Sequence, residues 1–349
     1  MSGLNDLNSL RTHTARINLT KLTCEHEKKD AIKRAMRNIS KNCGERSILS
    51  IDEKEEQIVQ PLESGIISLD KAIGIGGYPR GRIIEIFGTE SSGKTTVALH
   101  AVAETQKNKG FVAYVDVENA LDPNYAKNIG VDLENLFLSQ PNSAEQAFEV
   151  LEEFLMSGAF DLIVVDSVAS LTPQKEIDGI NLSGEQAKLM SEQLRKLVSI
   201  INKSKCVVIF INQIRSTMNK ILGEKDTTPG GKALKFYSSV RIEITANDMI
   251  KNPSGEIIGK KTKLNIQKNK VSAPFKEAVV ANIFGEGLTP YLDIIKIGIQ
   301  QGLIRKQGEW YSFENQKIGK GIFEVKKYLQ THAIVFESLM ERVKSFEKK

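Results

Sequence analysis

The chain has 349 residues, of which 40% are hydrophobic and 26% charged, and its formal net charge is +5. This composition is that of a folded globular protein and excludes disordered and fibrous classes. No apolar run reaches the about 18 residues that a membrane helix needs, and the N-terminal residues lack the apolar core of a secretory signal. Cys24, Cys43 and Cys206 show neither metal-ligand nor disulfide spacing. We therefore expect a cytoplasmic protein without a membrane partner.

The N-terminal part is predicted to consist of a loose extension and a short arm. Residues 1–27 show no hydrophobic periodicity. Residues 30–41 carry apolar side chains at i, i+3, i+4 and i+7, which predicts an amphipathic helix that Gly44 ends. Residues 48–51 resemble a short strand. A lone helix and strand cannot bury their own apolar faces, so we expect the arm, residues 28–61, to dock on another body.

Residues 62–245 alternate strand and helix patterns, which predicts an α/β core, residues 62–286, built on a mainly parallel twisted sheet. Short, continuously apolar runs indicate strands that are covered on both faces, and they lie at 82–87, 111–117, 136–139, 162–166 and 206–211. The helix predicted at 144–157 has a capping box of Ser143 and Gln146 and ends at Gly158. Three more alternating runs, at 240–245, 262–267 and 278–284, predict an antiparallel extension of the sheet.

A complete phosphate-binding loop follows the first of these strands. Residues 88–95 read GTESSGKT, between a predicted strand and a predicted helix, which is the context that this motif requires. The glycines allow backbone amides to point at phosphate oxygens. Lys94 can reach the β- and γ-phosphates, and the Thr95 hydroxyl can ligate Mg²⁺. The expected nucleotide-binding residues of this segment are Gly88, Thr89, Glu90, Ser91, Ser92, Gly93, Lys94, Thr95 and Thr96.

Polar side chains at the ends of three further strands complete the predicted site. Asp166 ends an apolar run and is expected to hold Mg²⁺ through water. Glu118 follows the preceding strand and would lie at the same carboxyl edge, where it can orient the attacking water, or it is a solvated loop carboxylate. Gln213 follows a third strand and can contact the γ-phosphate. The polar segment 216–229 beyond it has no periodicity, and an insertion of this length is usually functional.

A small α/β domain is predicted over residues 287–349, from short helical segments and a turn at 308–313. Residues 301–349 contain ten Lys and Arg against six Asp and Glu, a local excess of +4. A basic face on a terminal module is compatible with DNA binding, although charge runs are usually solvated faces.

These motifs resemble the bacterial RecA recombinase family over residues 28–330. The stretches that carry the resemblance are GTESSGKTT, DVENALDPNYAKNIGVD, LSQP, DLIVVDSVASLTP, MSEQLRKL, FINQIR, TTPGGKALKFYSSVR, KNKVSAPF, GEG and WYS, in the family's order. The resemblance implies a RecA-type ATPase that uses ATP and Mg²⁺. It implies a helical homo-oligomeric filament that coats single-stranded DNA, pairs it with homologous duplex DNA and exchanges strands in repair. It also implies stimulated self-cleavage of a LexA-type repressor in the SOS response.

The resemblance assigns roles around the nucleotide. It implies that Glu118 orients the water, that Tyr125 and Asp122 hold adenine, and that Gln213 senses the γ-phosphate and couples it to a DNA-binding loop.

The resemblance also implies that the active site is completed between protomers. Lys268 and Lys270 match cations that reach the γ-phosphate of the adjacent subunit, and Phe236 matches an interface residue that relays this state. The arm, residues 28–61, would dock on a neighbour.

DNA contacts are implied at two loops, 174–188 with nearby helix positions and 215–232. The matching residues are Lys188, Ser191, Arg195, Arg215, Met218, Thr227, Gly230, Gly231 and Lys232. Met218 matches an apolar wedge that opens a gap between base triplets. The amides of Gly230 and Gly231 suit phosphate contacts that carry no sequence information.

The chain departs from the family pattern in four places. The first loop is about three residues shorter and has a net charge of −1, Leu222 replaces a Phe, and Asn119 replaces a His. The shorter loop bears on how the secondary duplex is held. The acidic C-terminal tail of the family is absent, from which we expect weaker autoinhibition of DNA binding.

The alternative is a hexameric helicase-type ATPase on the same core. The arm, the Lys268 and Lys270 pair and the C-terminal module argue against it. Strand exchange without processive unwinding distinguishes the two. A zinc-ribbon relative would need four metal cysteines, and the chain has three.

Overall fold

The computed structural model describes residues 24–44, 59–180, 184–214, 230–252 and 254–345. The chain forms two units, residues 1–58 and 59–349, and each is described by itself. The strand predicted at 48–51 lies outside the described residues, as do Arg215, Met218 and Thr227.

The N-terminal unit contains one described helix, α1 (Glu25–Cys43), which is longer at both ends than the predicted 30–41 and begins inside the predicted loose extension. The backbone N–H of Gly44 donates to the Ser40 carbonyl and ends the helix, as predicted. Ile32 and Ile39 of the apolar stripe remain 58% and 37% exposed. Within its described residues, this unit therefore leaves the apolar face of α1 uncovered.

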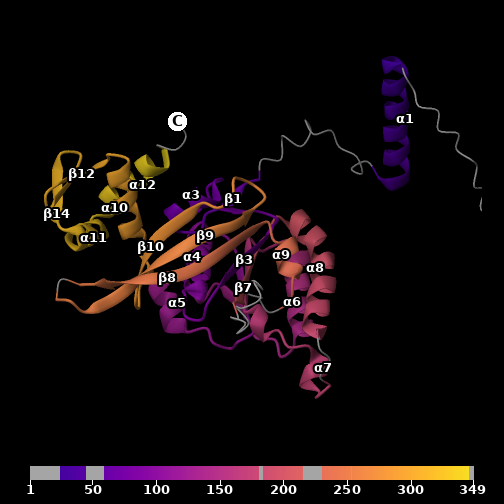
Figure 1. The fold of residues 1–349 in the computed structure, drawn as a ribbon, viewed down its shortest axis with the longest axis horizontal. Helices are drawn as coiled ribbons and strands as arrows, with labels where there is room; N and C mark the ends of the chain where they lie inside the picture. Colours follow the sequence, from indigo (N-terminus) through magenta and orange to yellow (C-terminus); the bar gives the residue numbers. More distant parts are fainter. Residues whose placement is uncertain (1–23, 45–58, 181–183, 215–229, 253, 346–349) are drawn as a thin grey trace, which may run out of the picture. The chain divides into compact units, whose positions relative to one another are not determined.

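The second unit is built on a sheet that has nine strands within the described residues, in the order β11-β10-β9-β8-β3-β7-β6-β4-β5 (Figure 1). The five strands predicted as parallel are confirmed, as β3 (Ile83–Gly88), β4 (Val112–Asp116), β5 (Leu136–Ser139), β6 (Leu162–Asp166) and β7 (Val207–Gln213). The remaining strands are β8 (Val240–Lys251), β9 (Ile257–Asn269), β10 (Glu277–Ile283) and β11 (Gly287–Leu288).

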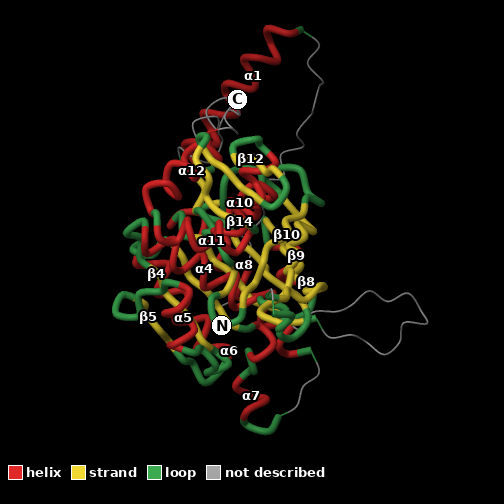
Figure 2. The backbone as a smooth tube through the Cα atoms, turned by 90° about the vertical axis from the view of Figure 1, so that its left-hand side faces the viewer, coloured by secondary structure: helices red, strands yellow, loops and turns green. Residues whose placement is uncertain are grey.

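The strand at 240–245, which is β8, was predicted to begin the antiparallel part of the sheet, but it belongs to the parallel part. β8 runs parallel to β3 and antiparallel to β9, so the antiparallel extension begins one strand later than expected. The partner of β8 on its parallel side is more than 150 residues away in the chain, and an alternating pattern does not reveal such a pairing. β8, β9 and β10 run side by side in both views of the backbone (Figures 1 and 2).

Helices cover both faces of the parallel strands. One face packs against α3 (Ile67–Ile73), α4 (Lys94–Lys107) and α5 (Pro123–Ile129), and the other against α6 (Ala144–Ser157), α8 (Glu185–Ser204) and α9 (Ala233–Tyr237). Successive residues of a strand point to opposite faces, so Val208 joins the second core and Ile209 the first. Burial on both faces explains why these strands are continuously apolar.

Short elements connect these layers: β1 (Pro61–Leu62), β2 (Tyr78–Pro79), the 3₁₀ turn η1 (Val168–Ser170) and α7 (Gln174–Ile177). The predicted cap of α6 is confirmed, because Ser143 Oγ accepts from the Gln146 N–H at 3.3 Å and Gly158 adopts a left-handed conformation. The side-chain oxygen of Gln146 accepts a hydrogen bond from the backbone N–H of Asn142 rather than from that of Ser143.

A smaller α/β body follows the core, with a three-stranded antiparallel sheet in the described residues and its own apolar cluster. Its elements are α10 (Pro290–Gln300), β12 (Ile304–Gln307), β13 (Trp310–Phe313), β14 (Gln316–Lys320), α11 (Ile322–Thr331) and α12 (Ala333–Ser345). The stretch predicted as a turn, 308–313, is in fact a two-residue turn followed by strand β13. The backbone N–H of Ser68, on α3 of the core, donates to Asp293 Oδ2 of α10 at 2.9 Å, and this bond joins the smaller body to the core. Within the core, the backbone N–H of Leu288 on β11 donates to His100 Nε2 at 2.9 Å.

The described helices include none with both the length and the apolar character of a bilayer span.

Candidate active site

The phosphate-binding loop leaves β3 at Gly88 and enters α4 at Lys94, in the predicted strand–loop–helix order. A Cβ on Gly88 would lie 2.4 Å from the Ile244 carbonyl oxygen, so only glycine allows this approach of the neighbouring strand. Gly93 precedes the helix with a φ of +107°. Lys94 is 8% exposed, and its Nζ donates to the Thr89 carbonyl at 2.8 Å. Burial lowers the pKa of Lys94, while the carboxylates of Asp166 and Glu118 oppose that effect.

The residues expected to bind Mg²⁺ meet where α4 begins and β6 ends. Thr95 Oγ1 donates to Asp166 Oδ2 at 2.9 Å, and the hydroxyl of Tyr114 donates to the same oxygen at 2.8 Å. Burial raises the pKa of Asp166 to about 6, against the two hydrogen bonds. Among the described residues, the buried hydroxyl of Ser92 in the loop has no hydrogen-bond partner. Hydroxyl and carboxylate oxygens are ligands that Mg²⁺ prefers, so these residues fit a magnesium nucleotide.

Glu118 is held at the same edge by donors from two other strands. Its Oε1 accepts from Ser167 Oγ at 2.5 Å, Ser170 Oγ at 3.2 Å and Gln213 Nε2 at 3.2 Å. The structure therefore brings Glu118 and Gln213 together, as the sheet edge predicted. The two serines were not predicted; the only signal for them is their position, directly after the strand that ends at Asp166.

A pocket of about 340 Å³ opens beside the loop and is lined in part by Thr96 and Tyr125. Thr96 Oγ1 and the Tyr125 hydroxyl are 2.8 Å apart. Asp122 caps α5, because its carboxylate accepts from the N–H groups of Asn124 and Tyr125. Tyr125 thus lines this pocket, whereas Asp122 is not among the described residues that line it.

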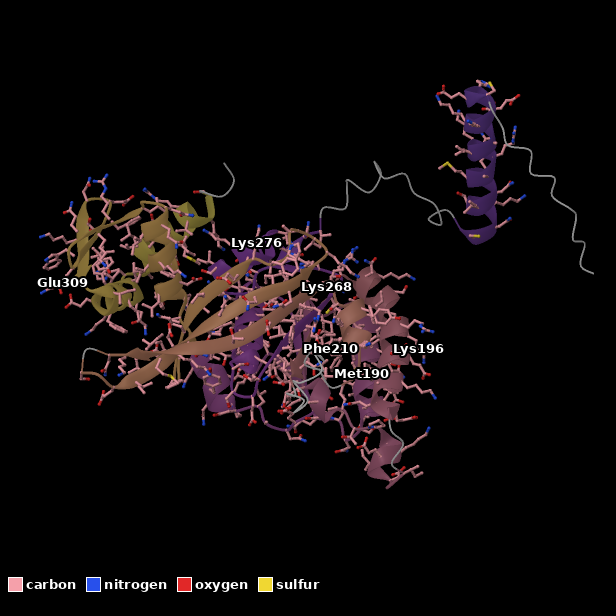
Figure 3. All side chains as sticks on the ribbon, in the orientation of Figure 1. Met190, Lys196, Phe210, Lys268, Lys276 and Glu309 are labelled. Carbon is pink, nitrogen blue, oxygen red and sulfur yellow. The ribbon has the colours of Figure 1, made fainter. Side chains whose placement is uncertain are left out.

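Of the two cations expected to act across an interface, Lys268 lies on β9 and Lys270 lies directly after its end. Lys268 Nζ donates to the carbonyls of Lys235 and Phe236, at 2.7 and 3.0 Å, at the end of α9. Burial, followed by repulsion from Lys270 and Arg241, lowers the pKa of Lys268 to about 8. Figure 3 labels Lys268 on the core. Lys270 is exposed, and so is Phe236, at 66%.

The segment 174–188, predicted as a loop, is partly helical. α7 covers its first four residues, and α8 begins at Glu185, so Lys188 lies in a helix together with Ser191 and Arg195. The N-cap of α8 is Gly184, which has a left-handed conformation. The amphipathic pattern that favours a helix starts directly after it. Lys188 and Arg195 are exposed and Ser191 is half-buried.

The described end of the second loop is seated on this first turn of α8. The N–H of Gly230 donates to Gln186 Oε1 at 3.2 Å, and a Cβ on Gly231 would lie 2.8 Å from the Cβ of Ala187. Gly230 itself packs against Met190, which belongs to the same buried cluster as Phe210 (Figure 3). Gly230, Gly231 and the exposed Lys232 are thus brought to the helix that carries Lys188 and Ser191.

Comparison with known proteins finds two matching family models. The one described as the RecA N-terminal domain matches residues 30–289, and the one described as the RecA C-terminal domain matches residues 292–346. The protein named "Protein RecA, plasmid" of Lactococcus lactis subsp. lactis is 57% identical over 319 residues, which cover 91% of this chain and 93% of that protein. Protein RecA of Streptococcus sanguinis (strain SK36) is 49% identical over 324 residues, with 91% and 85% covered. Protein RecA of Streptococcus gordonii is 49% identical over 325 residues, also with 91% and 85% covered.

Proposed function

The chain belongs to the RecA family, the recombinases of DNA repair, and on that premise we propose that it is a DNA-dependent ATPase that exchanges DNA strands. It forms a helical filament on single-stranded DNA and pairs that strand with homologous duplex DNA. The observation that carries the proposal is the hydrogen bond between Gln213 and Glu118. It joins the carboxylate expected to act in hydrolysis to the residue that leads into the second predicted DNA loop.

ATP binds with its triphosphate in the phosphate-binding loop. The backbone amides of residues 88–95 and the helix start hold the phosphates, and Lys94 leaves the Thr89 carbonyl to contact the β- and γ-phosphates. Thr95 and, through water, Asp166 would hold Mg²⁺. When bound, Mg²⁺ would neutralise charge on the phosphate oxygens.

Glu118 orients the water that attacks the γ-phosphate. In the described contacts, the Ser167, Ser170 and Gln213 donors all reach Oε1. Oε2 is thereby left to accept a hydrogen bond from the attacking water. A carboxylate held in one orientation places that water with little reorganisation, which is the main source of catalysis in phosphoryl transfer.

Gln213 couples the two sites. Its side-chain N–H donates to Glu118 Oε1, and a γ-phosphate oxygen would compete for that donor. A shift of Gln213 toward the phosphate moves the chain that follows it, which we propose to be the second DNA-binding loop.

Hydrolysis is completed between protomers of the filament. Lys268 and Lys270 reach the γ-phosphate of the adjacent subunit, and Phe236 lies at that interface. The exposed apolar face of α1 docks on a neighbour, which would cover Ile32 and Ile39.

DNA binds along the start of α8 and the second loop. Lys188, Ser191 and Arg195 lie at i, i+3 and i+7 on α8, and therefore on one face. Single-stranded DNA contacts this face together with Gly230, Gly231 and Lys232, and with Arg215, Met218 and Thr227 outside the described residues. Duplex DNA binds the basic C-terminal domain, residues 287–349, which follows the 62–286 core. We place the activity in the cytoplasm, where the filament would also stimulate the self-cleavage of a LexA-type repressor.

ATPase activity with and without single-stranded DNA tests the proposal. DNA should raise the turnover number of the wild-type chain, and Lys94→Ala should abolish nucleotide-dependent filament assembly. Glu118→Gln should bind ATP and DNA yet hydrolyse ATP slowly. DNA-independent turnover, or processive unwinding in place of strand exchange, would favour the helicase-type alternative.

A further inference from the structure

The pocket beside the phosphate-binding loop has two walls that come from distant parts of the chain. One wall is the loop with the start of α4, together with Tyr125. The other comes from the antiparallel extension and consists of Lys260 on β9, Asn282 on β10, and Phe284 and Gly285 just beyond it. The second wall was not predicted, because its residues follow the loop by more than 150 positions in the sequence and strand pairing alone brings them to the pocket.

The charges that line this pocket all have the same sign. Among its described lining residues, Lys94 and Lys260 are charged, and no Asp or Glu is present. A pocket with two ammonium groups and no carboxylate in its lining favours an anionic ligand. The two lysines come from opposite walls, so a ligand between them can contact both.

Lys260 already reaches across the pocket to the loop. It lies opposite Met249 of β8 and Asn282 of β10 in the sheet, and its Nζ donates to the carbonyl of Ser91. An ammonium group carries three N–H donors, and the described hydrogen bonds of Lys260 use one. The remaining donors are available to phosphate oxygens at the rim of the loop. Partial burial also lowers its pKa, because the ammonium is already partly removed from water.

We propose that Lys260 is a second phosphate-binding cation of the nucleotide site, provided by the same chain and directed at the phosphates that ATP and ADP share. This inference rests on the proposed ATPase function and adds a binding residue to it. Lys94 is assigned to the β- and γ-phosphates at the closed end of the loop. The pocket is also lined by the aromatic side chains of Tyr125 and Phe284, on which a base can stack. Because Lys260 Nζ reaches the Ser91 carbonyl within the phosphate-binding loop, we assign Lys260 to the α–β part of the polyphosphate.

A cation that contacts the shared phosphates has a distinct signature. It should strengthen ATP and ADP binding equally and leave the chemical step unchanged, which is uniform binding. A charge-assisted hydrogen bond of this kind contributes about tenfold in affinity. The affinity of the variant should also depend less on salt, because one ion pair with the ligand is lost.

The test is titration of the full-length chain, without DNA, with fluorescent ADP and a fluorescent non-hydrolysable ATP analogue over a salt series. Lys260→Gln removes the charge but keeps an N–H donor for the Ser91 carbonyl, so it separates ligand binding from support of the loop. Lys260→Arg keeps the charge. Lys261→Gln is the matched control, because Lys261 points to the opposite face of β9 and pairs with Asp248 at 3.2 Å.

The proposal is supported if Lys260→Gln binds both nucleotides about tenfold more weakly and its kcat at saturating ATP equals that of the wild type. Lys260→Arg and Lys261→Gln should retain nucleotide binding. Equal affinity of Lys260→Gln and wild type would overturn the proposal, and so would weakening confined to the ATP analogue. If the wild-type chain bound neither nucleotide, the proposed ATPase function itself would fail. Thermal melts of each variant verify that the fold is intact.

Discussion

Ser167 Oγ donates to Glu118 Oε1 across 2.5 Å, and this bond joins the end of β6 to the loop after β4. It is the shortest of the three hydrogen bonds that hold this carboxylate oxygen. Ser167 itself is buried, so its hydroxyl has little access to competing water. Ser167 thus fixes the orientation of the Glu118 carboxylate, which we propose to orient the attacking water.

We expect Ser167→Ala to lower kcat about tenfold with little change in KM, because small misplacement of a water-orienting group is costly. Steady-state ATPase kinetics with saturating single-stranded DNA measures this effect. Ser157→Ala, at the exposed end of α6, is the control. In the Glu118→Gln background, loss of Ser167 should cost little more, since the two act as a unit. If the two substitutions instead raised the activation free energy additively, so that their fold-losses in kcat multiplied, the assignment would be contradicted.

A buried ion pair lies beneath Gln213. Arg241 Nε donates to Glu85 Oε2 at 2.5 Å, and the Arg241 guanidinium lies 4.3 Å from the centre of the Phe87 ring. Glu85 is fully buried and also accepts from Asn212 Nδ2 at 3.1 Å. Asn212 in turn accepts from the Gln213 backbone N–H at 2.9 Å, so the pair supports the strand end that carries Gln213.

Glu85→Ala should lower the free energy of unfolding by about 3–5 kcal/mol, because it leaves the Arg241 charge buried without its partner. Denaturant titration measures the loss. The double variant Glu85→Met with Arg241→Met should recover much of it, since no unpaired charge remains. If the single and double variants were equally unstable, packing rather than charge would explain the effect.

The parallel strands and the phosphate-binding loop could be predicted because their signals are local. Burial on both faces makes strands such as β6 continuously apolar, and the loop's spacing is fixed by the phosphate that it holds. Glu118 and Gln213 could be brought together because parallel strands end at one edge of the sheet.

The rest of the site depends on pairings that sequence patterns do not encode. Lys260 reaches Ser91 only because β9 and β10 add to the sheet beside β8. The alternating pattern of β8 suits either parallel or antiparallel neighbours, so its parallel pairing with β3 was missed. The serines around Glu118 are small and polar, which is as typical of a loop as of an active site.

His100 on α4 accepts a hydrogen bond from the Leu288 N–H of β11 and so joins that helix to the edge of the core sheet. Burial lowers its pKa from 6.5 to about 4. A group with a depressed pKa in the folded state contributes stability that is fully present above the unfolded value, 6.5, and is lost as pH falls toward about 4. The full effect corresponds to about 3 kcal/mol.

His100→Gln should therefore flatten the fall in unfolding free energy between pH 6.5 and about 4, whatever its effect at neutral pH. Denaturant titrations across this range measure the slope. Parallel pH profiles for His100→Gln and the wild type would contradict this assignment.

The last prediction concerns the cation that we assign to the neighbouring protomer. In the single chain, Lys268 Nζ donates to carbonyls at the end of α9, and burial helps to lower its pKa to about 8. An ammonium with a lowered pKa gains from an anionic partner, and the γ-phosphate of an adjacent subunit would supply one. Lys268→Met should therefore abolish most DNA-dependent turnover while leaving ATP binding by the isolated chain intact.

Mixed filaments separate action in trans from action in cis. Lys268→Met retains Glu118, and Glu118→Gln retains Lys268, so an interface between the two variants in one order combines both intact groups. In a random equal mixture, about a quarter of the interfaces should be active, because the head-to-tail contact is directional. ATPase activity of the mixture on single-stranded DNA should thus exceed that of either variant alone. A mixture no more active than the average of its components would place Lys268 in the site of its own chain, and the shared-site assignment would fail.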